Sequence, residues 1–167
     1  MRRVLQRILI GCLMLSLIMA ITGCKGDSVT LKYSKSFQSF SEFDKIEPLL
    51  TRYYAGLRRA VEKTKPEDLN TFLIDEDTQL AQYELETFFN EYEQYKLNTA
   101  TDEDIKIYNK LHEIFLNTIA VISAYEMEIY VFTMDSSFIK PHSGTPEKLI
   151  EGMKEHLDNA YKKLATG

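Results

Sequence analysis

The chain has 167 residues, with 20 Lys and Arg against 25 Asp and Glu, so its formal net charge is −5. It has no Trp, seven Gly and four Pro, a composition that favours long regular elements. The acidic balance argues against nucleic acid and anionic lipid as ligands of the folded part.

The chain begins with a basic and then an apolar segment. Arg2, Arg3 and Arg7 precede an apolar run that ends at Ile21. The run has about 14 residues, the length of a signal-peptide core, and as a helix it would extend about 21 Å. A spanning helix must cross about 30 Å of hydrocarbon. We therefore interpret residues 1–23 as a leader that is cleaved.

The leader closes on the sequence Ile21-Thr22-Gly23-Cys24. This sequence resembles the lipobox of bacterial lipoproteins, in which an aliphatic residue, a small residue and Gly or Ala precede a Cys. The resemblance covers residues 1–24 only. It implies that the sulfur of Cys24 receives a diacylglycerol, that cleavage occurs just before it, and that the new amino terminus is acylated with a fatty acid such as palmitate. Two or more acyl chains anchor a protein stably to a membrane.

We expect residues 24–43 to form the lipidated Cys and a tether rich in Ser and Lys. Loss of the three leader arginines leaves 17 basic against 25 acidic residues, a net charge of −8. Cys12 lies in the leader, so the mature chain can form no internal disulfide. Val29, Leu31 and Tyr33 alternate with polar residues, and a short extended piece lying against the domain stays open as an alternative.

Residues 44–167 contain four stretches with the three-and-four spacing of amphipathic helices. The first stretch spans 44–63. Asp44 followed three residues later by Glu47 fits a capping box at its start. Five basic residues against three acidic ones give this helix a charge of +2.

The second stretch spans 66–98 and begins at Pro66, a residue common in the first helical turn. The segment "IDEDT" near residue 75 is a point at which this helix can break. Nine acidic residues against Lys96 alone give it a charge of −8. This acidic helix fits beside the more basic first one as a complementary pair, and the alternative is a docking surface for a cationic partner.

The third stretch spans 102–135, begins with a cap formed by Thr101 and Asp104, and extends about 50 Å. It carries an apolar seam at heptad spacing. The seam residues are Tyr108, Leu111, Phe115, Thr118, Ile122, Tyr125, Ile129 and Phe132. The fourth stretch begins at Thr145-Pro146. Short connections require antiparallel neighbours, so we predict an all-α fold, an up-down-up-down four-helix bundle after the signal peptide and tether.

The third stretch is apolar on nearly every side. Besides the seam, Leu116, Val121, Ala124 and Tyr130 fall on other faces, and these four are our candidate partner-binding residues. Such a helix must be covered on more than one side, and Glu126 and Glu128 make a lipid-spanning role unfavourable. Three interpretations stay open: the central element of the bundle, a groove for a partner or for self-association, and an internal cavity for an apolar ligand.

The sequence contains no catalytic or cofactor motif that we recognise. His112, His142 and His156 lack the Glu three residues earlier that a di-iron bundle needs, and His112-Glu113 lacks the second His of a zinc protease. No phosphate-binding Gly-rich loop and no G-x-S-x-G motif occurs. We expect no metal, no cofactor and no enzymatic activity, although a metal site assembled from distant residues such as His142 and Asp135 stays open.

The hypothesis from the sequence is a lipid-anchored binding or structural module of the bacterial cell envelope. It would face outside the cytoplasm from the cell membrane or the outer membrane, attached through the lipid on Cys24. We expect a protein partner or self-association, and no nucleic acid. The alternative is a carrier or sensor of a small apolar ligand that uses the bundle interior, and an enzyme is the third class.

Overall fold

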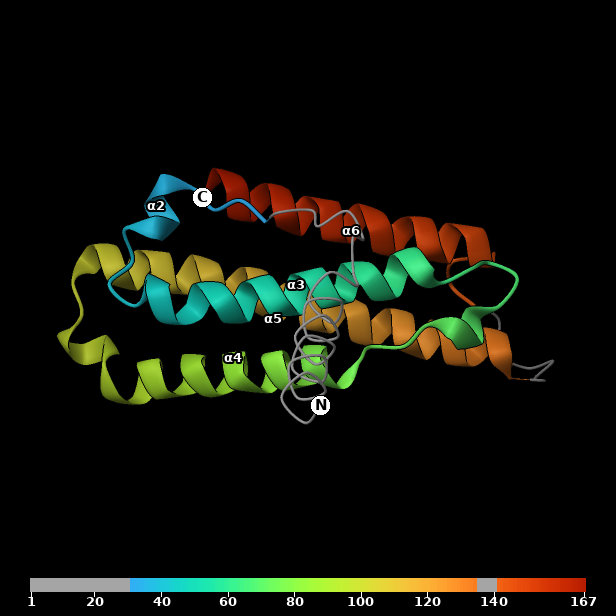
Figure 1. Cartoon of the computed structure of the whole chain (residues 1–167), viewed down its shortest axis with the longest axis horizontal. Helices are drawn as coiled ribbons and strands as arrows, with labels where there is room; N and C mark the ends of the chain where they lie inside the picture. Colours follow the sequence, from blue (N-terminus) through green and yellow to red (C-terminus); the bar gives the residue numbers. More distant parts are fainter. Residues whose placement is uncertain (1–30, 135–140) are drawn as a thin grey trace, which may run out of the picture. The chain divides into compact units, whose positions relative to one another are not determined.

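The computed structural model describes residues 31–134 and 141–167, and residues 31–167 form one compact unit. The predicted leader, the lipobox with Cys24 and the predicted helix end at residue 135 lie outside the described residues. The described part is mostly helical and contains no strand (Figure 1). The prediction of an all-α fold is confirmed.

Four long helices form a helical bundle. They are α3 (Phe43–Lys63), α4 (Glu76–Tyr95), α5 (Asp102–Thr133) and α6 (Pro146–Thr166). The short elements are α2 (Lys35–Gln38) and the 3₁₀ turns η1 (Leu69–Thr71) and η2 (Leu97–Thr99). Helix α3 packs along α4, α5 packs along α6, and α3 also contacts α6. The apolar core lies between these four helices.

Capping side chains determine where two of the helices begin. The hydroxyls of Thr101 and Thr145 each accept a hydrogen bond from the backbone N–H three residues later, so α5 and α6 begin where the sequence predicts. Helix α3 begins at Phe43 after Glu42, whose side chain makes no capping hydrogen bond. The predicted capping box at Asp44 is therefore wrong, since this residue already lies in the first turn.

Helix α4 is shorter than predicted. Residues 66–75 contain η1 and non-helical backbone, and α4 begins only after Asp75. The carboxylate of Asp75 accepts hydrogen bonds from the backbone N–H and the hydroxyl of Thr78, at 2.8 and 2.5 Å. The prediction of a helix over 66–98 is wrong for its first ten residues, because the acidic segment caps a helix there instead of continuing one.

The segment before α3 packs against the helices. Its buried apolar side chains are Leu31, Tyr33, Phe37 and Phe40. The backbone N–H of Ser34 donates to the carbonyl of Leu164 in α6 at 2.9 Å. Figure 1 accordingly places α2 beside the C-terminal end of α6. For residues 31–42 the structure contradicts the tether interpretation and favours the alternative of a piece lying against the domain, although Lys35–Gln38 is helical and not extended.

Aromatic side chains join three helices at the centre of the core. Tyr53 of α3 packs edge-on against Phe115 of α5, with ring centroids 5.4 Å apart, and Phe89 of α4 stacks on Phe115 at 5.3 Å. The hydroxyl of Tyr54 lies 3.0 Å from that of Thr118, and both residues are buried. These contacts fix which side of α5 faces the core.

Two glycines mark places where helices approach closely. A Cβ atom added to Gly56 of α3 would lie 1.7 Å from the hydroxyl oxygen of Thr78 in α4. A Cβ atom on Gly152 of α6 would lie 2.6 Å from the hydroxyl oxygen of Tyr125 in α5. At Gly56 three atoms of the buried Thr78 would clash with a Cβ, so α3 and α4 need glycine there, whereas at Gly152 a Cβ would displace the Tyr125 hydroxyl.

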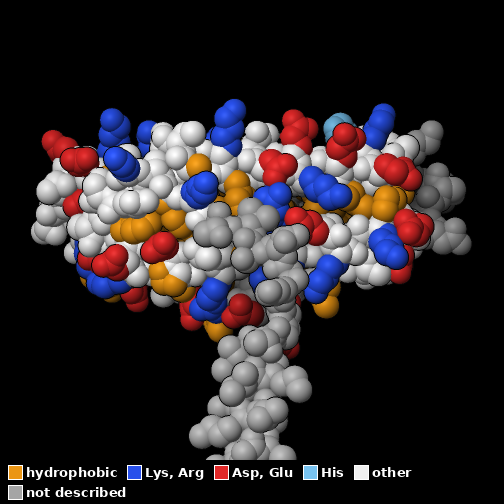
Figure 2. Space-filling model, turned by 45° about the horizontal axis from the view of Figure 1, so that its top comes forward, with side chains coloured by type: hydrophobic (Ala, Val, Ile, Leu, Met, Phe, Trp, Pro, Cys, Tyr) orange, Lys and Arg blue, Asp and Glu red, His pale blue; other side chains and the backbone are white. Residues whose placement is uncertain are grey.

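Opposite charges join α3 to α4. Arg52 forms salt bridges with Asp77 and Glu84, both at 3.0 Å, and Arg59 forms one with Asp75 at 3.4 Å. This arrangement is the complementary pair of helices that the charges predict. On the side of the molecule shown in Figure 2, Lys and Arg side chains are interspersed with Asp and Glu.

Candidate functional site

The four candidate partner-binding residues all lie on α5, and the structure does not bring them to one surface. Leu116 and Tyr130 are 50% and 57% exposed, Ala124 is exposed and Val121 is half-buried. At about 100° per residue, Leu116 and Tyr130 lie within about 40° of each other around the helix axis, whereas Val121 lies about 140° from Leu116. Leu116 and Tyr130 share one surface, Ala124 lies at its edge and Val121 lies outside it.

Leu116 and Tyr130 belong to a longer row of exposed side chains, which we call the exposed seam. Its members are Leu116, Ala120, Ser123, Met127, Tyr130 and Met134. They recur at intervals of four and three residues over about 27 Å of helix. Met127 is 64% exposed, and Met134, the C-cap of α5, is 39% exposed. The seam therefore presents four large apolar side chains to solvent.

A second row on α5, the buried seam, faces the core. Its members are Leu111, Phe115, Thr118, Ile122, Tyr125 and Ile129, of which Tyr125 is half-buried and the others are buried. Each residue of the exposed seam lies five positions after one of the buried seam. This repeat was present in the sequence, so it could have located Met127 and Met134, which the analysis of the sequence missed.

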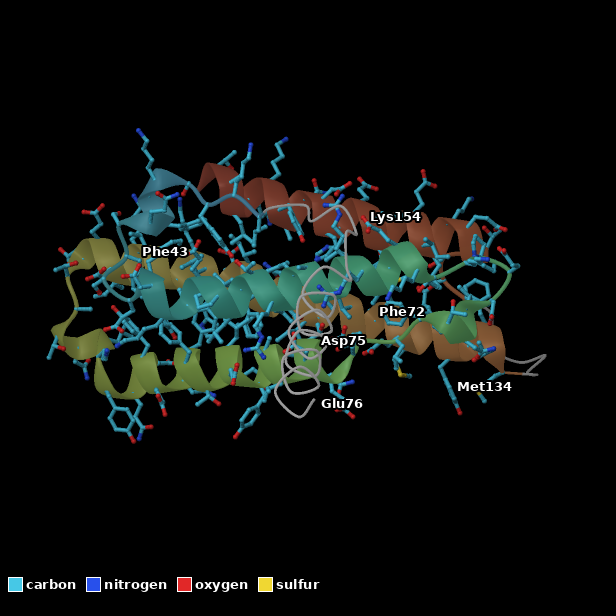
Figure 3. The ribbon with its side chains drawn as sticks, in the orientation of Figure 1. Phe43, Phe72, Asp75, Glu76, Met134 and Lys154 are labelled. Atoms are coloured by element: carbon cyan, nitrogen blue, oxygen red, sulfur yellow. The ribbon has the colours of Figure 1, made fainter. Side chains whose placement is uncertain are left out.

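The exposed seam is uncovered in part because α4 is short. Helix α5 has 32 residues and α4 has 20, which correspond to about 48 and 30 Å. Figure 3 shows Asp75 and Glu76, where α4 begins, well short of Met134 at the end of α5. The turn η1 contacts α5, yet Met127 and Tyr130 stay exposed. The last turns of α5 extend past the start of α4.

Carboxylates border the exposed seam. We call Glu86 and Glu93 of α4, together with Glu126 of α5, the acidic rim. Burial lowers the pKa of His112 in α5, and the Glu93 carboxylate opposes that shift. Burial raises the pKa of Tyr53, and the charges of Glu86 and Glu126 raise it further. Glu93 thus acts on His112, one turn before Leu116, and Glu86 lies two turns from Glu93 on the same side of α4. Glu126 is four residues before Tyr130, on the flank of the exposed seam.

The charge of the acidic rim is not balanced by neighbouring cations. From Leu111 to Thr133, α5 has three Glu and no Lys or Arg. Within residues 31–134 and 141–167, no salt bridge involves Glu86, Glu93 or Glu126. Packed neighbours partly desolvate the carboxyl group of Glu126 and raise its pKa, although its side chain still contacts solvent. The rim would gain from an incoming cation.

Helix α5 also has the length and apolarity of a membrane-spanning helix, the one such helix within the described ranges. Of its most apolar window, 22% is buried. The window contains parts of both seams. The low buried share thus agrees with the exposed fractions of Leu116, Met127 and Tyr130.

The described residues contain no candidate metal site, and two of their histidines lie in separate packed places. No group of three or more His, Cys, Asp or Glu that could hold a metal ion occurs in the described part, and Asp135 lies outside the described residues. His112 stacks on Phe89 with ring centroids 4.5 Å apart. His156 borders an open hollow of about 430 Å³ between α5 and α6, lined mainly by polar and charged residues, and burial lowers its pKa.

Known proteins provide no match to this chain. A scan against protein-family models finds none, and searches of curated proteins and of solved structures find none either. The functional argument therefore starts from the exposed seam and the acidic rim.

Proposed function

We propose that this protein is a lipid-anchored helical binding module of the bacterial cell envelope, facing outside the cytoplasm. The observation that carries the proposal is the exposed seam. Fully burying one large apolar side chain is worth about 1.5–3 kcal/mol, and Leu116, Met127 and Tyr130 forgo much of this gain in the isolated protein. Single exposed apolar residues are common, but a row at regular helical spacing is typical of a docking surface.

The proposed anchor is the lipid on Cys24. Because Leu31 and the residues after it pack against the helices, only Lys25 to Thr30 separate Cys24 from the packed segment. These seven Cα–Cα steps can cover at most about 25 Å. Lipidation would therefore hold the module close to the bilayer, where it can reach membrane proteins and other envelope components.

The proposal includes an up-down-up-down order of α3, α4, α5 and α6. Support comes from the contacts of α3 with α4, of α5 with α6 and of α3 with α6, and from the short connections between successive helices. In this arrangement α5 is antiparallel to both α4 and α6. One side of α5 then lies in the core while another faces away from all three neighbours.

Surface binding is favoured over carriage of an apolar ligand in the interior. The centre of the bundle is occupied by the rings of Tyr53, Tyr54, Phe89 and Phe115, each at most 1% exposed. An interior ligand would have to displace these packed rings, and close-packed cores resist such changes. A partner at the exposed seam requires no such rearrangement.

Photo-crosslinking in intact cells tests the proposed binding surface. The full-length protein would carry benzoylphenylalanine in place of Tyr130, or in place of Tyr83, a 67% exposed tyrosine of α4, as the matched control. We expect a discrete adduct from position 130 that is absent at position 83 and that disappears when Met127→Glu is added. The same adducts from both positions, or none from position 130, would contradict a binding function of this surface.

Mass spectrometry of the mature protein tests the anchor separately. We expect an amino-terminal Cys24 carrying a diacylglycerol and a fatty acid, and release from the membrane, or an unprocessed precursor, in Cys24→Ala. An unmodified Cys24 would contradict the proposed lipid anchor. It would not affect the proposed docking surface, which the crosslinks test independently.

A further inference from the structure

We infer that the occupant of the exposed seam is an amphipathic α-helix of another protein, whose apolar face is bordered by Lys and Arg. This inference rests on the proposed binding function and adds the class of partner. Three features of the described surface carry it: the spacing of the seam, the small residues at its centre and the charge beside it.

The spacing of the exposed seam fits a second helix. Alternating intervals of four and three residues are those of a helix that packs against another at a shallow angle, with side chains of one inserted between side chains of the other. A β-strand alternates every two residues and would not match this row. The seam from Leu116 to Met134 covers 18 helical steps, so a partner helix of about five turns would cover it.

The centre of the seam has small side chains. Ala120 and Ser123 are small, and the large side chains of Leu116 and Met127 lie on either side of them along the helix. Such a small-residue gap admits a Leu or Phe of a facing helix. The flexible, polarisable side chains of Met127 and Met134 can adapt to a partner's shape.

The charge beside the seam selects a cationic partner. Pairing of two copies through this seam would bring Glu113 and Glu126 of one chain towards the same residues of the other, and α5 offers no Lys or Arg between Leu111 and Thr133 to offset them. A bilayer rich in anionic lipid would likewise repel the acidic rim. Lys and Arg at the edges of a partner helix would instead pair with Glu86, Glu93 and Glu126.

Two synthetic peptides provide the test. Both are hydrocarbon-stapled helices of about 18 residues with the same apolar face, one bordered by Lys and the other by Glu. They are titrated into the mature lipidated protein in phosphatidylcholine nanodiscs, with empty nanodiscs as the blank. We expect the Lys-bordered peptide to bind about tenfold more tightly or better, and its affinity to fall as salt is raised.

Variants of the protein separate the apolar and the electrostatic parts. Met127→Glu should abolish binding of the Lys-bordered peptide, and circular dichroism should show an unchanged melting curve. The double variant Glu86→Lys/Glu93→Lys should reverse the preference between the two peptides. Glu91→Lys is the control for position: it reverses one charge on α4 where the double variant reverses two, and Glu91 lies about 140° or more around the helix from Glu86 and Glu93, so the preference should persist.

Each contrary result has a defined meaning. Equal affinity for the two peptides, or an unchanged preference in the double variant, would overturn the inference of a cationic partner helix, even if position 130 forms crosslinks. A dimer in sedimentation that Met127→Glu dissociates would identify a second copy as the occupant and also overturn the inference. Adducts between position 130 and lipid alone would identify the bilayer as the occupant of the exposed seam and would overturn the inference as well. Absence of any adduct would instead overturn the proposed function itself.

Discussion

The two seams of α5 differ in environment far more than in composition. In the buried seam, Phe115 and Ile122 are at most 3% exposed and contact α3, α4 or the rest of the core. In the exposed seam, Leu116 and Met127 are half exposed or more, although they are also large and apolar. Both rows have heptad spacing and run along the same helix, five residues apart.

The difference shows that heptad spacing alone does not decide whether a row of α5 is buried, and that the neighbouring helices decide how much of it they cover. Helix α4 supplies Phe89 to one side of α5, but α4 begins only at Glu76 and is about 18 Å shorter than α5, so the last turns of α5 extend past it. The hydrogen bond between Tyr54 and Thr118 fixes the rotation of α5 about its axis. The remaining apolar row therefore stays in solvent and is available for a partner.

The largest expected effect comes from placing the same charge in each seam. Ile122→Glu puts an unpaired carboxylate in the core, which should cost about 3–5 kcal/mol and remove most of the folded population. Met127→Glu, at the equivalent exposed position, should change the unfolding free energy by less than about 0.5 kcal/mol. Urea unfolding followed by circular dichroism measures both. Unfolding of both variants would mean that the exposed seam is packed.

Truncation of two adjacent residues gives the next largest effect. Phe115→Ala should destabilise the protein by about 3–5 kcal/mol, because it opens a cavity among the rings of Tyr53 and Phe89. Leu116→Ala removes a half-exposed side chain and should cost less than about 1 kcal/mol. Thermal melts of the two variants, with the wild type as reference, test whether the core ends between these neighbours. Similar losses would contradict the assigned rotation of α5.

Local signals in the sequence were sufficient for the helical class and for several boundaries. The caps of α5 and α6 depend on Thr101 and Thr145, whose hydroxyls bind backbone N–H groups only three residues away. The buried seam was predictable because Phe115 and Ile122 belong to a regular heptad row. Leu116 and Tyr130 were also identified as residues outside that row.

Long-range contacts account for what the sequence did not show. Helix α4 begins late because Asp75 caps it through Thr78, and Thr78 fits only because Gly56 of α3 leaves room. Residues 31–42 pack because four of their apolar side chains find a surface formed by distant segments. Periodicity within α5 separates Val121 from Met127, but which of the two faces stays exposed depends on the position and length of α4, which the sequence of α5 does not contain.

Removal of one buried hydroxyl tests what fixes the rotation of α5. The Tyr54 hydroxyl lies 3.0 Å from that of Thr118 and donates to the Ile114 carbonyl at 3.4 Å. Tyr54→Phe should cost about 1 kcal/mol, because Thr118 keeps its own hydrogen bond to Ile114. Tyr130→Phe, which removes an exposed hydroxyl, should leave the unfolding free energy unchanged within about 0.5 kcal/mol. Chemical denaturation distinguishes them, and equal effects would contradict the buried contact.

The smallest expected effect depends on pH and concerns the boundary between the two seams. His112 lies one turn before Leu116 and stacks on Phe89, so α4 covers this position. Burial lowers the pKa of His112 below its usual value of 6.5, and the opposing charge of Glu93 is the smaller influence. Below pH 6.5 the imidazole of His112 is protonated in the unfolded chain but stays neutral in the folded chain. Folding stability therefore falls as the pH is lowered towards the pKa of the folded state.

His112→Phe keeps an aromatic ring against Phe89 and removes this titration. We expect the variant to lose less unfolding free energy than the wild type between pH 7 and pH 5, by less than about 1 kcal/mol because solvent reaches part of the ring. Burial lowers the pKa of His156 as well, so the loss should be reduced further in His112→Phe/His156→Phe. Urea titrations at both pH values measure the difference within each variant. If His112→Phe loses as much unfolding free energy between pH 7 and pH 5 as the wild type, His112 is solvated. The exposed side of α5 would then begin one turn before Leu116, at a position that α4 covers in this structure.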